Sequence, residues 1–137
     1  MALIHEAVGT VVKDATGFFS RGTRVVMIPN ATFEQSEYRA ENYLRRSKFC
    51  GSGFDGFMQE LVLLPASRVV AVPDAIQNEV AAFTELVSVA AHAVNRFESI
   101  AHGQRDCVGV LGDGNLGFIV SLILKSRYPD MHVCVFG

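Results

Sequence analysis

Hydrophobic and polar residues follow two different patterns along the chain, and the change falls near Pro73. Before this proline the apolar runs are short, with glycine and proline at the corners between them. Such runs predict the β-strands of a small barrel or sandwich. We expect strands at residues 7–13, 24–28, 57–64 and 69–72. The polar stretch 31–52 has no sustained period, and we expect a long surface loop there with at most a helical turn.

After Pro73 the pattern becomes helical. Residues 75–97 are apolar on most of the circumference of a helix, which predicts a largely buried helix, or two helices broken near Thr84. A polar connection over 100–106 follows. The last part of the chain then has the order strand, turn, helix and strand, which is typical of a βαβ unit. We place these elements at residues 107–111, 112–117, 116–125 and 132–136.

The turn of this βαβ unit has the spacing G-x-G-x-x-G, which between a strand and a helix indicates a dinucleotide-binding turn. Gly112 permits the sharp turn, Gly114 lets the backbone approach a pyrophosphate, and Gly117 lets the helix pack closely on the sheet. The amino end of the helix then faces the phosphates. The alternative is a strand-to-helix turn that binds nothing. The candidate cofactor-binding residues are Gly112, Asp113, Gly114, Asn115, Leu116 and Gly117.

Composition limits the class of protein. The chain has 137 residues, half of them hydrophobic, and a net charge of −2, so it can bury a core as one domain or as two incomplete ones. The charge gives no indication of nucleic acid or an anionic membrane as a partner. The apolar runs are shorter than a membrane span, and the first residues lack the pattern of a secretory signal. The three widely spaced cysteines are typical of reduced, buried thiols, and we expect a cytoplasmic protein.

Glu85 is the most informative single residue, because it interrupts an apolar helical run. An ionised carboxylate in such a place either reaches solvent at a helix end or has a partner, such as a metal, a lysine or a proton. His92 lies about two helical turns further on the same face. That separation is too long for the two side chains to hold one ion, and we interpret His92 as a core or interface histidine.

His5 and Glu6 are a second candidate, since both residue types bind zinc. Neighbouring residues of a regular strand point to opposite faces, so a shared ion would need irregular backbone at this point. The basic residues of segment 45–48 could meet a substrate phosphate, although a solvated face explains them more simply. No two cysteines have the spacing of a structural zinc site, and we interpret Cys50 as a loop thiol.

Taken in order, several stretches of the chain resemble the medium-chain zinc-containing alcohol dehydrogenase family. Each pattern is common by itself, but their order along nearly the whole chain is specific. The stretches are residues 5–12, 22–26, 55–60, 85–93 and 112–117. Within the family, segments 42–50, 54–60 and 112–118 are similar to the ribulose-5-phosphate reductase branch. That branch makes ribitol 5-phosphate for CDP-ribitol and for cell-wall polymers such as teichoic acid.

The resemblance implies a fold and a chemistry. The fold is α+β followed by α/β: a partial GroES-like β-barrel catalytic domain over residues 1–73, then linking helices and the start of a Rossmann nucleotide-binding domain over residues 74–137. The chemistry is zinc-assisted hydride transfer between NADPH and a ketose or polyol phosphate, ribulose 5-phosphate to ribitol 5-phosphate. His5, Glu6 and Glu85 would hold the Zn2+, with Glu6 at or just behind the metal as a catalytic residue. The implied partners are the sugar phosphate, a cytidylyltransferase and further copies of the chain.

The sequence also departs from the family pattern. The family's cysteine ligand upstream of the His-Glu strand has no counterpart, Leu86 replaces a proline, Thr23 replaces an aspartate, and the residue that would read the adenosine ribose falls beyond Gly137. The choice between NAD and NADP therefore cannot be read from these residues. The similarity to the branch implies NADP, and NAD is not excluded. Because a two-strand parallel sheet is not expected to stand alone, we expect a fragment that is poorly active as a reductase by itself. The alternatives are a non-catalytic nucleotide-binding or interaction module, a zinc-free quinone-reductase-like enzyme, or another zinc polyol or alcohol dehydrogenase.

Overall fold

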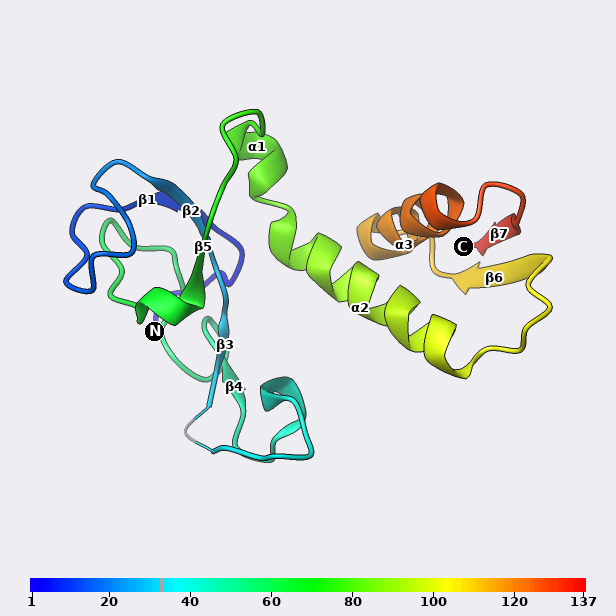
Figure 1. Ribbon diagram of the computed structural model, residues 1–137, viewed down its shortest axis with the longest axis horizontal. Helices are drawn as coiled ribbons and strands as arrows, with labels where there is room; N and C mark the ends of the chain where they lie inside the picture. The colour runs from blue at the N-terminus through cyan, green and yellow to red at the C-terminus, as the bar shows by residue number, and fades with distance from the viewer. Residues whose placement is uncertain (33) are drawn as a thin grey trace. The chain divides into compact units, whose positions relative to one another are not determined.

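The computed structural model describes residues 1–32 and 34–137 of the chain (Figure 1). The chain forms two compact units, residues 1–84 and residues 85–137. Each unit is described by itself below. The first unit extends past residue 73 and also contains the short helix α1 (Asn78–Ala81). Because these units are defined by contacts alone, the expected domain division between residues 73 and 74 stays a prediction.

The first unit is built on an antiparallel sheet with the strand order β1 (Val8–Thr10), β2 (Arg24–Met27) and β5 (Val69–Ala71). Val26 of the central strand is opposite Val8 on one side and Val70 on the other. The central strand is the buried one, as expected where both neighbours cover it, and its Val25 and Val26 are 4% and 8% exposed. Val26 packs with Val72 and Ala81, so the core extends from the sheet to α1.

A second, shorter ladder lies within the stretch that we expected to be mostly loop. It pairs β3 (Asn30–Ala31) with β4 (Lys48–Phe49), and two 3-10 turns accompany it, η1 (Glu41–Tyr43) and η2 (Ala66–Arg68). Strands of two residues are too short to produce an alternating pattern. The helical turn was therefore predicted from the sequence and the ladder was not.

The predicted strand over residues 57–64 is wrong. An apolar run becomes a strand only where its backbone finds a ladder partner. Here the N–H groups of Phe57 and Met58 donate to the carbonyls of residues 4 and 3, and the structure assigns no strand to the segment. Leu61 and Leu63 are 72% and 97% exposed. The first strand is also shorter than predicted, because regular pairing begins only at Val8.

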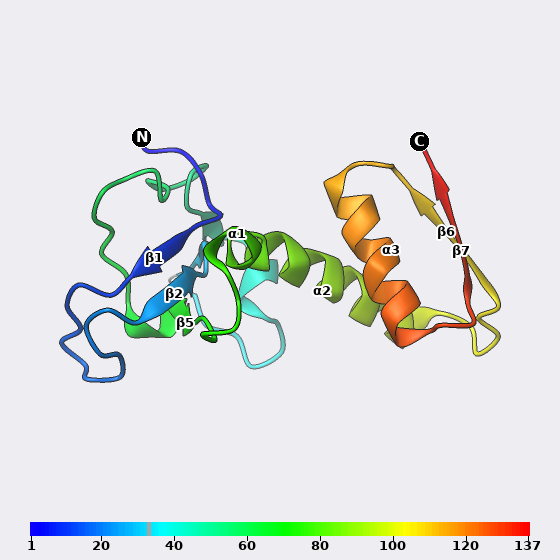
Figure 2. The same ribbon diagram turned by 90° about the horizontal axis from the view of Figure 1, so that it is seen from above.

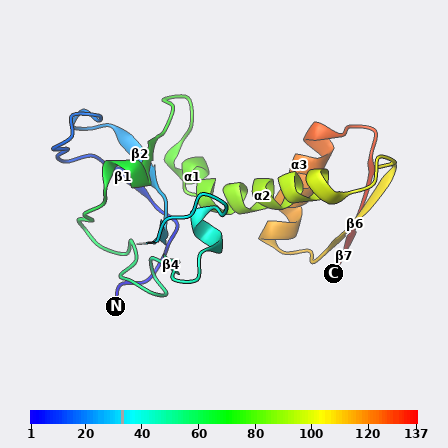
Figure 3. The ribbon, with the colours of Figure 1, turned by 60° about the horizontal axis from the view of Figure 1, so that its bottom comes forward.

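The second unit contains the predicted βαβ arrangement. Strands β6 (Cys107–Leu111) and β7 (His132–Phe136) are parallel, and they begin and end where the sequence predicted. Helix α3 (Asn115–Arg127) joins them and lies beside the strand pair (Figures 2 and 3). The core of the unit is formed by Val94 of α2 (Thr84–Ile100) with Leu124 and Met131, which are 1%, 3% and 3% exposed.

Helix α2 confirms one expectation and corrects another. The break near Thr84 is present, since α1 ends at Ala81 and α2 begins at Thr84. The helix is not largely buried within its unit: Val87 and Val89 are each 41% exposed, although Ala90 is fully buried. Composition shows that a helix is apolar but not which of its faces another element covers. His92 is exposed as well, so it is not a core residue of this unit.

The cysteines are unpaired, as expected, but they are not all buried. Cys50 is 7% exposed and Cys134 is half-buried, whereas Cys107 is exposed on the open face of β6. Burial raises the pKa of the Cys50 thiol, which keeps this thiol in its protonated form at neutral pH. Within the described residues, no helix combines the length and the apolar character needed to cross a lipid bilayer.

A polar network joins the ends of α2 and α3. Glu98 accepts hydrogen bonds of 2.9 Å each from Arg127 Nη1 and from the Tyr128 hydroxyl. Arg105 donates to the Tyr128 hydroxyl at 3.1 Å and to the backbone carbonyl of Glu98 at 2.9 Å. The hydrogen bond from Arg127, followed by that from Tyr128, holds the pKa of Glu98 below its ordinary value.

This pKa makes the stability of the second unit depend on pH. A carboxylate whose pKa is lowered by folding stabilises the folded state above its ordinary pKa of about 4.3, and this contribution is lost as the pH falls through the lower, folded value. We expect the thermal midpoint of the chain, followed by circular dichroism, to fall more steeply below that pH than the midpoint of Glu98→Gln. Tyr128→Phe removes one of the two donors and should give an intermediate slope. Parallel curves for all three proteins would contradict this account.

Candidate functional site

Residues 2–4 and 55–58 lie directly against each other in the first unit. The hydrogen bonds between them are Gly56 N to Ala2 O at 2.8 Å, Phe57 N to Ile4 O at 2.8 Å, Met58 N to Leu3 O at 3.0 Å and Ala2 N to Asp55 Oδ1 at 2.8 Å. Gly56 and Phe57 are buried, and Phe57 is only 6% exposed. The segment that leads into His5 is therefore held by backbone groups on a buried turn.

Gly56 is required for this approach. A Cβ atom at position 56 would lie 2.2 Å from the carbonyl oxygen of Ile4 and 2.3 Å from that of Leu3. Ile4 itself has φ +69°, in the left-handed region that a β-branched residue rarely adopts. Such a conformation persists only where the surrounding structure imposes it. The hydrogen bonds to the buried turn supply that restraint.

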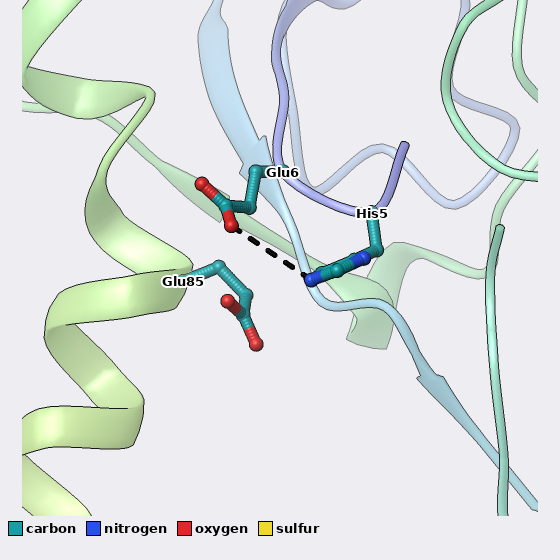
Figure 4. A group of neighbouring side chains, drawn as sticks. All are labelled: His5, Glu6 and Glu85. Atoms are coloured by element: carbon teal, nitrogen blue, oxygen red, sulfur yellow. Dashed lines mark ion pairs between the residues drawn. The ribbon is translucent and has the colours of Figure 1, made fainter. Parts of the chain in front are cut away.

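The irregular backbone before the first strand lets two neighbouring side chains serve one site. A regular strand would direct His5 and Glu6 to opposite faces, but regular pairing does not begin until Val8. His5 Nε2 and Glu6 Oε1 are 3.8 Å apart (Figure 4). Two ligands of one tetrahedral zinc lie about 3.4 Å apart, because zinc bonds to nitrogen and oxygen measure about 2.0–2.2 Å. The irregular backbone that a shared ion would need is thus present.

The surroundings of the pair are partly apolar. His5 meets the ring of Phe49 edge-on, with 6.1 Å between the ring centroids. A cleft of about 350 Å3 is lined by Ile4, His5, Glu6, Ala82 and Phe83. This volume falls within the range of about 300–1,000 Å3 that is usual for small-molecule sites. The cleft is therefore large enough for a metal ion and one small substrate.

Glu85 is the first residue of the second unit. It lies in the first turn of α2 and is half-buried, and the chain reaches it two residues after Phe83, which lines the cleft. A carboxylate in the first turn interacts favourably with the positive end of the helix dipole. Glu85 therefore lies at a helix end, as one of the two interpretations of the sequence had it, and it is half-buried there.

The basic residues of segment 45–48 have other contacts. Arg46 Nε lies 3.5 Å from Glu34 Oε1, and Lys48 Nζ lies 5.1 Å from the ring centroid of Phe54. Arg45 is exposed. An ion pair and a cation–π contact of this kind are common surface interactions. The solvated face, which the sequence already favoured, is the better description of this segment.

The glycine turn of the second unit has the local geometry that its sequence suggested. Gly112 has φ +113°, and its N–H donates to the Phe136 carbonyl at 2.7 Å. A Cβ at Gly117 would lie 2.0 Å from the Gly112 carbonyl oxygen, so the first turn of α3 passes directly over the end of β6. Nothing lies within 4 Å of a Cβ added at Gly114, which is the N-cap of α3. The amino end of α3 is therefore open to a ligand.

The sequence did not identify the residues that hold the His-Glu segment. Asp55 had no signal beyond its place in the family-like stretch 55–60, yet it accepts the Ala2 N–H. Ile4 has no sequence signal at all, because its strain arises from a tertiary contact. Gly56 lies in the same stretch and precedes an apolar run, and neither feature reveals its close approach to residues 3 and 4.

Comparison with known proteins identifies the family. The sequence profile of the Alcohol dehydrogenase GroES-like domain matches residues 1–74, which is more than half of the chain. The chain belongs to this family. The fold class expected from the sequence is confirmed, with the qualification that the strands of the first unit do not close into a barrel within the residues that the structure describes.

Relatives extend the match to the whole chain. A ribulose-5-phosphate reductase of Bacillus spizizenii is 57% identical over 137 residues, and ribulose-5-phosphate reductase 1 of Staphylococcus aureus is 48% identical. Each alignment covers all of this chain but 40% of the relative. The chain therefore spans about two fifths of the length of these relatives.

Solved structures give the same picture of the fold. The crystal structure of S. aureus TarJ in complex with NADPH has a TM-score of 0.76 and 41% sequence identity, and the match covers the whole of this chain and 36% of that one. Haloferax mediterranei glucose dehydrogenase, in complex with NADP, Zn and gluconolactone, has a TM-score of 0.85 over 98% of this chain and 41% of its own. Its 24% identity supports the fold alone.

The second and third glycines of the turn predict different mutational effects. Gly117→Ala should destabilise the second unit by roughly 1–3 kcal/mol, because the methyl group meets a backbone carbonyl that cannot move aside cheaply. Gly114→Ala should cost less than about 1 kcal/mol, the usual difference between residues at an N-cap. Urea unfolding followed by circular dichroism measures both. Equal destabilisation by the two variants would contradict the close approach at Gly117.

Proposed function

We propose that the chain carries the zinc and phosphate-cradling parts of an NADPH-dependent reductase that converts ribulose 5-phosphate to ribitol 5-phosphate. The observation that supports this most directly is the His5–Glu6 pair, whose ligand atoms are 3.8 Å apart beside a cleft of suitable size. The identity of 57% to a ribulose-5-phosphate reductase over the full length of the chain supports the choice of substrate.

We propose His5, Glu6 and Glu85 as the zinc ligands. Each offers one ligand atom, an imidazole nitrogen or a carboxylate oxygen. A histidine with two carboxylates is a donor set of the type that Zn2+ accepts, and catalytic zinc sites keep a fourth position open for substrate. Bound there, zinc would polarise the ketone oxygen while a nicotinamide supplies the hydride.

The chain's own residues have separate tasks in this proposal. His5 binds through a neutral ring nitrogen, and the contact with Phe49 restrains the orientation of its ring. Glu6, half-buried beside the cleft, holds the metal or moves a proton next to the reacting oxygen. The apolar lining from Ile4 and Phe83 limits the entry of water.

The glycine turn would hold the cofactor. We propose that Gly112, Asp113, Gly114, Asn115, Leu116 and Gly117 form the pyrophosphate site, with the backbone N–H groups at the start of α3 donating to phosphate oxygens. The open space at Gly114 supports this assignment. The choice of NADP over NAD rests on the similarity to TarJ, whose structure contains NADPH.

A chimera tests the proposal in the context of a complete enzyme. In the B. spizizenii reductase, the two fifths of the sequence that align with this chain are replaced by residues 1–137. We expect the chimera to retain zinc and to oxidise NADPH when ribulose 5-phosphate is added. Glu85→Ala in the chimera should lower kcat/KM at least about 100-fold, since loss of a metal ligand removes several kcal/mol of transition-state stabilisation.

Glu79→Ala is the matched control, because it removes an exposed carboxylate of α1 that lies outside the proposed site. It should leave kcat/KM and the zinc content unchanged. A correctly folded chimera without zinc or without reductase activity would contradict the proposal and favour a non-catalytic module.

A further inference from the structure

The way the His-Glu segment is held suggests a role for the turn beneath it. We propose that residues 51–58, here called the glycine support, position His5 and Glu6 for the metal before it binds, and that Asp55 and Gly56 are positioning residues. This inference rests on the proposed zinc site. It concerns residues that do not bind the metal themselves and that look like an ordinary surface turn in the sequence.

The first argument is the closeness of the fit. Two glycines lie against Ile4. A Cβ atom added at Gly56 would be 2.2 Å from the Ile4 carbonyl oxygen, and a Cβ atom added at Gly51 would be 3.2 Å from the Ile4 backbone. Gly51 also has φ +84°, which L side chains rarely adopt. Neither position accepts a side chain without displacing residue 4, and residue 4 precedes the first ligand directly.

The second argument is that the support is anchored. The N–H of Cys50, just before the support, donates to the Pro29 carbonyl at 3.0 Å, and Gly51 N donates to Phe54 O at 2.8 Å. Cys50 and Phe57 are buried, at 7% and 6% exposure. The turn is therefore fixed to the body of the unit and can impose a conformation on the segment above it.

The third argument is the strain at Ile4. A left-handed isoleucine would relax to an extended conformation if nothing opposed it. Relaxation would change the direction in which residues 1–3 leave the His5–Glu6 dipeptide, and it would release the hydrogen bonds that hold the backbone directly before the two ligands. The hydrogen bonds from Gly56, Phe57 and Met58 oppose it. Residues that orient metal ligands commonly change metal affinity about 10–100-fold when they are mutated.

Asp55 allows a test that leaves the core intact. Its side chain is 64% exposed and accepts the Ala2 N–H through Oδ1. Asp55→Ala removes that hydrogen bond, whereas Asp55→Asn keeps an oxygen in the same place. Gly56→Ala is the stronger perturbation. Gly103→Ala is its matched control, because Gly103 is exposed, has no positive φ and has nothing within 4 Å of an added Cβ.

Two measurements on the full chain decide the question. Cobalt(II) titration, followed by visible absorption, gives the metal affinity; NMR relaxation of the metal-free chain gives the backbone order of residues 4–6. We expect Gly56→Ala to weaken cobalt binding at least about tenfold, as is usual for residues that orient ligands. Asp55→Ala removes a single hydrogen bond and should weaken it about threefold. Asp55→Asn and Gly103→Ala should match the wild type. The order parameters should fall from about 0.85 toward 0.6 in the two impaired variants.

The outcomes separate this inference from the proposed function. If the wild type does not bind cobalt but the order parameters of residues 4–6 fall in Gly56→Ala and Asp55→Ala, the proposed zinc site is wrong. The glycine support then still orders the His-Glu segment. If cobalt binds equally well to the wild type, Gly56→Ala and Asp55→Ala, the positioning role is overturned and the zinc site stands. Unchanged order parameters in Asp55→Ala would also overturn it, even if Gly56→Ala proved unable to fold. A fall in thermal midpoint without a change in affinity would indicate a merely structural turn.

Discussion

The contact between Gly56 and the carbonyl groups of residues 3 and 4 is the constraint on which the candidate site depends. It brings two backbone segments closer than any side chain would allow, and it holds Ile4 at φ +69°. His5 and Glu6 follow directly in the irregular backbone before the first strand, and their ligand atoms lie 3.8 Å apart. One glycine and one strained residue thereby fix the backbone that leads into a pair of potential ligands.

The second unit also contains a close backbone approach at a glycine. Gly117 lets the first turn of α3 cross the end of β6 at a distance that excludes a Cβ, and Gly114 leaves the amino end of the helix open. In the proposal, the first close approach positions two side chains, and the open amino end of α3 offers backbone N–H groups to a phosphate. The chain belongs to the family of the Alcohol dehydrogenase GroES-like domain, and the proposed reaction requires both features.

The sequence predicted what depends on local pattern and missed what depends on tertiary contact. The bounds of β6 and β7 followed from apolar runs between turn residues, and the break near Thr84 followed from composition. The apolar run 57–64 failed as a strand, because hydrophobicity does not reveal whether a backbone has a ladder partner. The sequence could state that a shared ion at His5 and Glu6 needs irregular backbone, but the contact between residues 2–4 and a turn about fifty residues away is visible only in the fold.

X-ray absorption at the zinc edge tests the central claim most directly, because it identifies ligand atoms without reference to activity. The account predicts that the zinc-loaded chain shows only nitrogen and oxygen neighbours at about 2.0–2.2 Å, with the outer-shell signal of a single imidazole that disappears in His5→Ala. A sulfur neighbour at about 2.3 Å, or a histidine signal that survives His5→Ala, would contradict it.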